Sequence, residues 1–320
     1  MSRGAVKQGL HPRNRFRSGY DFPALVLASP ALARFVAPHA HGELSINYAD
    51  PSAVKALNQA LLKQAYGIAS WDLPGGSLCP PIPGRCDYVH HLADLLAGAG
   101  DASIPRGASV RVLDVGVGAN CIYPLLGASE YGWSFVGTDV DPASLRWAQR
   151  LARAQAPLAG LIEFRLQPVA SQCFAGVVRP GEHFAASMCN PPFHASAAAA
   201  ATGTLRKVRN LRGAGATRAA ARPVLNFGGR AGELWCPGGE LGFIRRMIGE
   251  SAMLPRACRW FTSLVSKSVH LPPLYQALKY AGARDVRTIG MAQGRKASRI
   301  LAWSFEPREA SAGPRAAALG

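Results

Sequence analysis

The chain has 320 residues, of which 48% are hydrophobic and 17% charged, a composition that excludes a wholly disordered protein. Its 36 basic residues outnumber 19 acidic ones, and the net charge of +17 indicates a polyanionic partner, nucleic acid first. The beginning of the chain has no apolar signal segment, and the most apolar early run, residues 22–36, is interrupted by prolines, so we expect a monomeric cytoplasmic protein that binds no membrane.

Residues 1–84 predict a basic and partly helical extension that binds RNA. Only basic charges precede the first acidic residue, Asp21, and three of the arginines among them are candidates for RNA contacts: Arg13, Arg15 and Arg17. Apolar residues recur at helical spacing over 51–65, and Asp50 or Ser52 can cap the start of that helix. A loop rich in proline and glycine then leads to Arg85.

Residues 85–306 alternate between helical and strand patterns. We expect helices over 88–96, 142–156, 240–252 and 272–281, and strands over 110–114, 134–138, 161–166, 184–189, 260–266, 286–291 and 298–305. The last two strands should form an antiparallel hairpin. The pattern predicts an α/β fold with a seven-stranded, mostly parallel sheet and helices on both faces, followed by a disordered tail over 307–320.

A basic insert, residues 197–232, interrupts this alternation after the fourth strand. No acidic residue lies between Asn190 and Gly232, and the segment is rich in glycine and arginine. Such a loop suits contacts with phosphates, although a solvated surface loop is the alternative. The predicted RNA contacts here and after the fifth strand are Arg206, Lys207, Arg209 and Lys267.

The first strand runs into a glycine loop. Gly116 and Gly118 match two positions of the G-x-G-x-x-G pattern, but the third position is Cys121, which weakens a dinucleotide interpretation. Asp114, directly before the loop, would repel a pyrophosphate and suits a ligand that carries an ammonium group. S-adenosylmethionine (SAM) has such a group and no phosphate, so we predict cofactor contacts from Asp114, Gly116 and Gly118.

The second strand ends in two acidic residues. An acid about twenty residues beyond a glycine loop can bind both hydroxyls of a ribose. Either acid could instead cap the following helix. We assign the cap to Asp141, because Pro142 follows it directly, and the ribose to Asp139.

The fourth strand ends in Asn190-Pro191-Pro192-Phe193. Two consecutive prolines stop a strand, because neither has a backbone N–H to donate. The Asn190 amide and the Phe193 ring are then held at the carboxyl end of the sheet, where open α/β sheets bind ligands. Amide and carbonyl oxygens can accept both hydrogens of a planar NH₂ group while a ring stacks on its heterocycle. A simple proline turn is the alternative.

Together these motifs resemble the Rossmann-like SAM-dependent methyltransferases, and more narrowly the bacterial 23S rRNA adenine N6-methyltransferase family called RlmF, which is related to eukaryotic small nuclear RNA adenine methyltransferases. The resemblance rests on the stretches 11–15, 20–25, 78–85, 114–124, 190–194, 226–229, 233–236 and 260–266. It implies methylation of adenine 1618 in 23S rRNA, free or in an assembling large subunit. It also implies cofactor contacts from Arg85, Gly116, Asp139 and Asn190.

The turn suggests a mechanism. We expect Asn190 and the Pro191 carbonyl to accept the two N6 hydrogens of adenine, Pro192 to keep the turn rigid, and Phe193 to stack on the base. Protein N5-glutamine methylation is an alternative, although a tyrosine is usual at the aromatic position there. DNA adenine methylation and a non-enzymatic RNA-binding assembly factor on the same fold stay open.

Cysteines and histidines give little sign of other chemistry. The seven cysteines are scattered, without a C-x-x-C spacing, so we expect reduced and mostly buried thiols. Cys189 lies in an apolar strand and is more consistent with a core thiol than with a nucleophile. His90 and His91 lie on a predicted helix without partners at metal spacing, so no metal is predicted.

Overall fold

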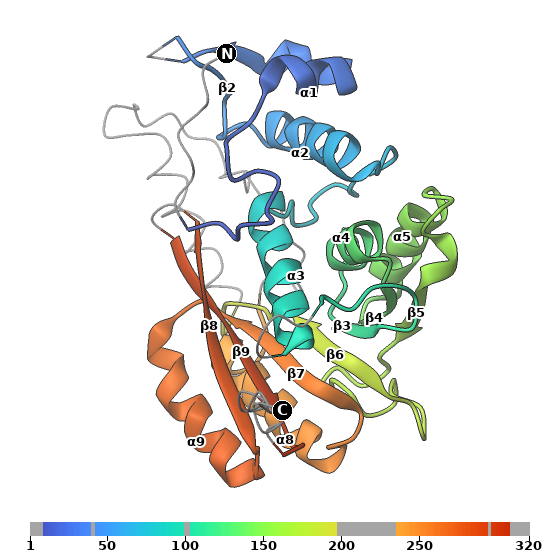
Figure 1. Cartoon of the computed structure of the whole chain (residues 1–320), viewed down its shortest axis with the longest axis vertical. Helices are drawn as coiled ribbons and strands as arrows, with labels where there is room; N and C mark the ends of the chain where they lie inside the picture. The colour runs from blue at the N-terminus through green and yellow to red at the C-terminus, as the bar shows by residue number, and fades with distance from the viewer. Residues whose placement is uncertain (1–8, 40–41, 99–102, 197–234, 294–295, 308–320) are drawn as a thin grey trace, which may run out of the picture.

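The computed structural model describes residues 9–39, 42–98, 103–196, 235–293 and 296–307. The predicted insert 197–232 and the tail beyond residue 307 lie outside these ranges. The N-terminal part, drawn in blue to cyan in Figure 1, comprises α1 (Phe22–Ala28), η1 (Pro30–Phe35), β1 (Val36–Pro38), β2 (Leu44–Ile46), α2 (Pro51–Tyr66) and α3 (Ile82–Ala97). Asp50 caps α2 through a hydrogen bond from the Ser52 N–H, as the sequence predicts.

The described part of the chain forms a seven-stranded main sheet, which confirms the predicted fold class. The strands are β3 (Arg111–Val115), β4 (Ser134–Asp139), β5 (Ile162–Leu166), β6 (Phe184–Cys189), β7 (Cys258–Val265), β8 (Asp285–Gln293) and β9 (Lys296–Ser304). Their order is β5-β4-β3-β6-β7-β9-β8. Strands β3 to β7 run parallel, and β8 and β9 form the antiparallel hairpin.

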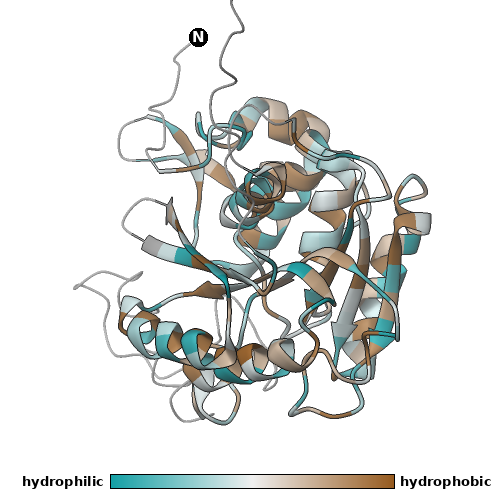
Figure 2. Cartoon of the chain, turned by 60° about the horizontal axis from the view of Figure 1, so that its bottom comes forward, coloured by the Kyte–Doolittle hydropathy of each residue, from teal (hydrophilic) through white to brown (hydrophobic). Residues whose placement is uncertain are grey.

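Each face of the sheet has its own hydrophobic core. Alternate residues of one strand face opposite sides, so Val112 packs with α3, α4 (Ile122–Tyr131) and α5 (Pro142–Arg153), whereas Leu113 packs with α8 (Gly239–Met253) and α9 (Leu271–Ala281). Hydrophobic and hydrophilic residues accordingly alternate along the helices in Figure 2. Within the described ranges, no helix is both long enough and apolar enough to cross a bilayer.

Two helices differ from the sequence prediction. Helix α4 was not predicted, because nearly all of its residues are buried and its sequence lacks the polar face that marks an amphipathic helix. Helix α3 begins six residues before the predicted start, since Pro83 lies in its first turn, where a missing N–H costs no helical hydrogen bond. Arg85 is therefore a helical residue and not the end of a loop.

The proposed boundary at residue 84 does not interrupt the packing. Leu57 and Leu61 of α2 belong to the same buried cluster as Leu125 of α4. The extension and the sheet thus share one core, and Figure 1 shows α3 running between them.

Candidate active site

A cavity of about 500 Å³ opens where β3, β4 and β6 end. Its wall includes five of the residues that the sequence predicts for the site: Gly116, Gly118, Asp139, Asn190 and Pro192. Strand β3 pairs in parallel with both β4 and β6, so their carboxyl ends meet at one edge of the sheet. This is the edge at which open α/β sheets bind ligands.

The glycine loop depends on left-handed backbone at two positions of its pattern. Gly116 has φ +77° and Gly118 has φ +62°, backbone angles that residues with a Cβ rarely adopt. Cys121, at the third position of the pattern, also has a positive φ of 52° and is fully buried at the start of α4. The Gly118 N–H donates to Asp139 Oδ2 at 2.9 Å, so the loop and the acid of β4 hold each other in place.

Of the two acidic residues at and just after the end of β4, Asp141 has the predicted role of helix cap. Asp141 accepts hydrogen bonds from the N–H groups of Ala143 and Ser144, and so caps α5. Asp139 Oδ1 accepts the Asp141 N–H at 2.9 Å. Asp139 lies on the wall of the cavity.

Arg85 and Asp114 are buried beside the cavity and are not on its wall. Asp114 is 1% exposed, and within the described residues neither of its carboxylate oxygens has a hydrogen-bond partner. Burial, reinforced by the charge of Asp139 and opposed by that of Arg85, raises the pKa of Asp114 to about 8. Arg85 donates to the Tyr123 hydroxyl, but its Nε also lacks a partner in this part of the chain. Buried polar groups normally have a hydrogen-bond partner, so these two groups are candidates to bind a ligand.

A chain of hydrogen bonds from α3 and β7 holds the backbone directly before Asn190. The Cys189 N–H donates to the Tyr88 hydroxyl at 3.2 Å, and this hydroxyl lies 2.7 Å from Thr262 Oγ1. Helix α3 thereby fixes the last residue of β6. The oxygen of the Asn190 amide is buried, and none of the described residues donates to it.

The segment before α8 supports the same turn from the other side. Residues His194 and Trp235 form an isolated parallel bridge, and the Cys236 N–H donates to the His194 carbonyl at 3.0 Å. Gly239 has φ +58°, and a Cβ there would lie 3.1 Å from the Ala195 nitrogen. The first turn of α8 thus packs directly on the backbone that follows Phe193.

Sequence reasoning missed several residues of the cavity wall. These are Gln167, Gln172, Trp235, Phe243 and Arg246. Three come from the start of α8 and the segment before it, which is separated from Asn190 by the long insert. Periodicity predicts α8 as a helix but gives no sign of which of its residues face the cavity.

The residues that the sequence predicts for RNA contact differ in their surroundings. Arg13 donates to Asp94, the Tyr131 hydroxyl and the His90 carbonyl, and Arg15 forms an ion pair with Glu130. Arg17 and Lys267 are exposed. Arg206, Lys207 and Arg209 lie outside the described residues.

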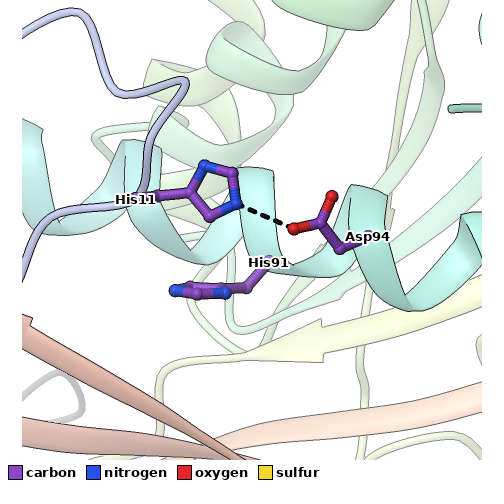
Figure 3. Close-up of side chains that lie close together, drawn as sticks. All are labelled: His11, His91 and Asp94. Carbon is purple, nitrogen blue, oxygen red and sulfur yellow. Dashed lines mark hydrogen bonds and ion pairs between the residues drawn. The ribbon is translucent and has the colours of Figure 1, made fainter.

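His11, His91 and Asp94 lie close together, with ligand atoms within 4.8 Å of one another (Figure 3). The expectation that His91 lacks partners at metal spacing is therefore wrong, because His11 comes from a distant segment. His11 Nδ1 accepts the Arg13 N–H, so its Nε2 carries the proton and donates to Asp94 at 2.8 Å. Since the Arg13 guanidinium also binds Asp94, we infer that this cluster holds the N-terminal segment against α3.

All seven cysteines are free, and all except Cys236 are buried. Burial raises the pKa of the Cys189 thiol well above its usual range. A thiol that stays protonated is a poor nucleophile. This supports the prediction of a core thiol at this position.

Comparisons with known proteins agree with this geometry. A family described as RNA methyltransferase matches residues 4–307. A protein named ribosomal RNA large subunit methyltransferase F from Yersinia enterocolitica is 54% identical over 299 residues, covering 93% of this chain and 88% of that protein. The chain belongs to the RlmF family. Another RlmF relative, from Serratia proteamaculans, is 53% identical over 96% of this chain and 90% of its own length.

Solved structures extend the likeness of this RlmF chain to more distant proteins. The hMettl16 catalytic domain in complex with the MAT2A 3'UTR hairpin 1 is 32% identical, with a TM-score of 0.77, over 93% of this chain and 96% of that one. The N-terminal domain of human METTL16 in complex with SAH is 30% identical, with a TM-score of 0.71, over 93% and 99%.

Proposed function

We propose that this protein transfers a methyl group from SAM to N6 of one adenine in large-subunit ribosomal RNA, adenine 1618 of 23S rRNA. The observation that carries the proposal is the buried amide oxygen of Asn190, which lacks a donor among the described residues and shares a cavity with Gly116 and Asp139. An acceptor of this kind suits a planar NH₂ group, and the glycine loop with its acid suits a nucleoside cofactor.

The buried groups fit SAM. When bound, SAM supplies a methyl group on a positively charged sulfur. Its amino acid portion carries one ammonium and one carboxylate, which match the unpartnered carboxylate of Asp114 and the unpartnered Nε of Arg85. In our proposal Arg85 holds the carboxylate, Asp114 the ammonium and Asp139 the ribose hydroxyls. The SAH complex of the related human domain supports this choice of cofactor.

The turn would orient the target base. Asn190 Oδ1 accepts one N6 hydrogen and the Pro191 carbonyl accepts the other, which directs the nitrogen lone pair toward the methyl group. The lone pair is delocalised into the ring, so positioning and hydrogen bonding contribute most of the rate. Half-buried Phe193 stacks on the adenine once it has left its RNA stack.

RNA as the substrate is supported by charge and by relatives. The net charge is +17, the relatives are named for the large subunit, and a related catalytic domain is solved with an RNA hairpin. We propose that Arg17, Lys267 and the basic insert contact phosphates. We also propose that the protein acts as a cytoplasmic monomer.

Labelled methyl transfer tests the function. Purified protein, methyl-labelled SAM and unmodified 23S transcript should yield label on a single adenine, located by mass mapping of RNA fragments. A glutamine methyltransferase would place the label on polypeptide. Label on polypeptide, on cytosine or on no molecule would overturn the proposal.

Asn190→Ala tests the central residue. We expect the rate of methyl transfer to fall at least 100-fold, because removing one preorganised hydrogen-bonding group commonly costs about that much. Single-turnover kinetics with saturating SAM measures this rate. Gln276→Ala removes an exposed amide on α9 and should leave it unchanged. Normal turnover by Asn190→Ala would reject the role of the amide.

A further inference from the structure

The outer face of α5 carries a row of cations. Leu145, Ala148 and Leu151 are buried against the sheet. The opposite face exposes three arginines, Arg146, Arg150 and Arg153. No acidic residue occurs between Asp141, which caps the helix, and Glu163. The amphipathic period of the helix therefore gathers positive charge on one side.

These arginines lack ion-pair partners in the described part of the chain, as does nearby Lys63. Lys63 and Arg150 line the same surface hollow. The acidic residue of that hollow, Asp72, is neutralised by Lys55, whose Nζ lies 2.8 Å from its carboxylate. The face thus keeps a surplus of positive charge that the protein itself does not balance.

The Trp147 ring lies among these cations. The indole N–H of Trp147 donates to the Asp72 carbonyl at 2.9 Å, which fixes the orientation of the ring. The Arg150 guanidinium lies 4.1 Å from the ring centroid. The guanidinium lies over one face of this fixed indole, so a nucleic acid base would stack on the other face.

Two hollows and the active-site cavity follow one another along α5. The first hollow is bordered by Arg150 and Asp72, and the second by Arg146 and Pro74. Farther along, Ser144 and Leu78 line the active-site cavity. One wall of this row is α5, and the other is the segment 69–78.

Hydrogen bonds to the rest of the fold hold the second wall, the segment 69–78, in place. Gln155 Nε2 donates to the Ser70 carbonyl at 2.7 Å, and the Trp71 indole donates to the Asn120 carbonyl at 2.9 Å. The twelve residues of α5 extend about 18 Å. The hollows are therefore preformed, and they form an interrupted groove along α5 that has the active-site cavity at one end.

We propose that this groove, the α5 groove, binds the single-stranded RNA that flanks the target adenine. The inference rests on the proposed function and deepens it. Arg146 and Arg150 are separated by one turn, about 6 Å along the helix, which is of the order of the distance between neighbouring phosphates in an extended strand. They bind successive phosphates while one base stacks on Trp147. Such contacts guide the strand without reading its sequence.

Binding of an rRNA fragment with and without the flanking nucleotides tests the groove. For Arg146→Ala/Arg150→Ala we expect the dissociation constant of the longer fragment to rise at least tenfold at low salt. The slope of log affinity against log salt should fall by about 1.4, since each cation on a single strand contributes about 0.7. SAM affinity, measured by calorimetry without RNA, should not change.

Lys279→Ala/Arg284→Ala is the matched control. It also removes two exposed cations without ion pairs among the described residues, one on α9 and one shortly after it, and α9 lies on the other side of the molecule from α5 in Figure 1. It should bind both fragments like the unmodified protein. Trp147→Ala should weaken binding of the longer fragment about fivefold or more, whereas Trp147→Phe, which keeps a ring but loses the N–H that orients it, should weaken binding less than Trp147→Ala does.

Failure of the groove and failure of the function are distinguishable. If the unmodified protein methylates rRNA but the α5 double variant matches its control in affinity and salt slope for both fragments, the groove proposal is overturned and the function stands. Equal losses with both fragments would also overturn it. If the unmodified protein does not methylate rRNA, the proposed function itself fails.

Discussion

Asp114 carries a carboxyl group that folding removes almost completely from water. Its carboxyl has a pKa of about 8, against an ordinary value of 3.8, chiefly because burial penalises the charged form. Between these two values the folded chain binds a proton that the unfolded chain has lost. The contribution of Asp114 to the free energy of unfolding therefore falls as pH rises from about 4 to about 8, and it levels off above that.

Binding of SAM should reverse this protonation. At pH 7 the carboxyl of the free protein is mostly protonated, and a nearby ammonium favours its ionised form. We expect SAM binding to release close to one proton, measured by calorimetry in buffers of different ionisation enthalpy. Asp114→Asn should abolish that release and weaken SAM binding at least tenfold. Unchanged proton release in the variant would show that another group titrates.

At the scale of an element, the first turn of α8 requires a glycine at position 239. Gly239→Ala places a Cβ on left-handed backbone and within 3.1 Å of the Ala195 nitrogen. We expect a loss of about 2 kcal/mol or more in the free energy of unfolding, measured in urea, because both strain and the contact must be relieved. The relief displaces the backbone after Phe193, so the rate of methyl transfer should fall more than tenfold in protein that is still folded.

Gly249→Ala on the same helix is the control. This glycine is exposed, its φ is not in the left-handed region, and a Cβ there meets no atom within 4 Å. The change should raise the free energy of unfolding by about 0.5–1 kcal/mol. Activity should stay normal. Equal activity of both variants would mean that α8 does not set the position of the turn.

The sequence predicts a helix or strand well where the spacing of its apolar residues matches the faces that are buried in the structure. Strand β6 has the bounds that its apolar run predicts, and Asp141 caps α5 as its place before Pro142 predicts. Helix α4 was missed because burial on all sides removes the amphipathic signal. The early start of α3 was missed because Pro83 and Gly84 read as a loop.

Long-range contacts of the site could not be predicted from spacing. Sequence order predicts that Gly116, Asp139 and Asn190 meet, because parallel strands end at one edge. Trp235 and Arg246 reach the same cavity across an insert, and no periodicity specifies where such a return segment lies. The same holds for His11, which meets Asp94 only through the packing of the N-terminal segment on α3.

Across the whole molecule, charge serves two purposes that the sequence alone does not separate. Arg13 is bound by Asp94 and Tyr131, whereas Arg17, four residues on, is exposed without an ion pair among the described residues. Ion pairs within the fold hold the N-terminal segment against α3. Cations without them are available to a polyanion. The total of 36 basic residues therefore overstates the number that can bind RNA.

Arg13→Ala and Arg17→Ala should separate these purposes. Arg13→Ala leaves Asp94 without its guanidinium, so we expect a loss of about 1 kcal/mol in the free energy of unfolding, modest because both groups are partly exposed. The pKa of Asp94 is lowered from 3.8 in the folded state, so this stabilisation should be fully present above about pH 4 and be lost progressively as pH falls through the lower folded-state pKa. Arg17→Ala should change stability by less than about 0.5 kcal/mol but reduce the salt slope of RNA binding by about 0.7. Urea unfolding and RNA titration at several salt concentrations measure both. If Arg13→Ala lost RNA affinity at unchanged stability, the N-terminal segment would be an RNA contact and not a fastening.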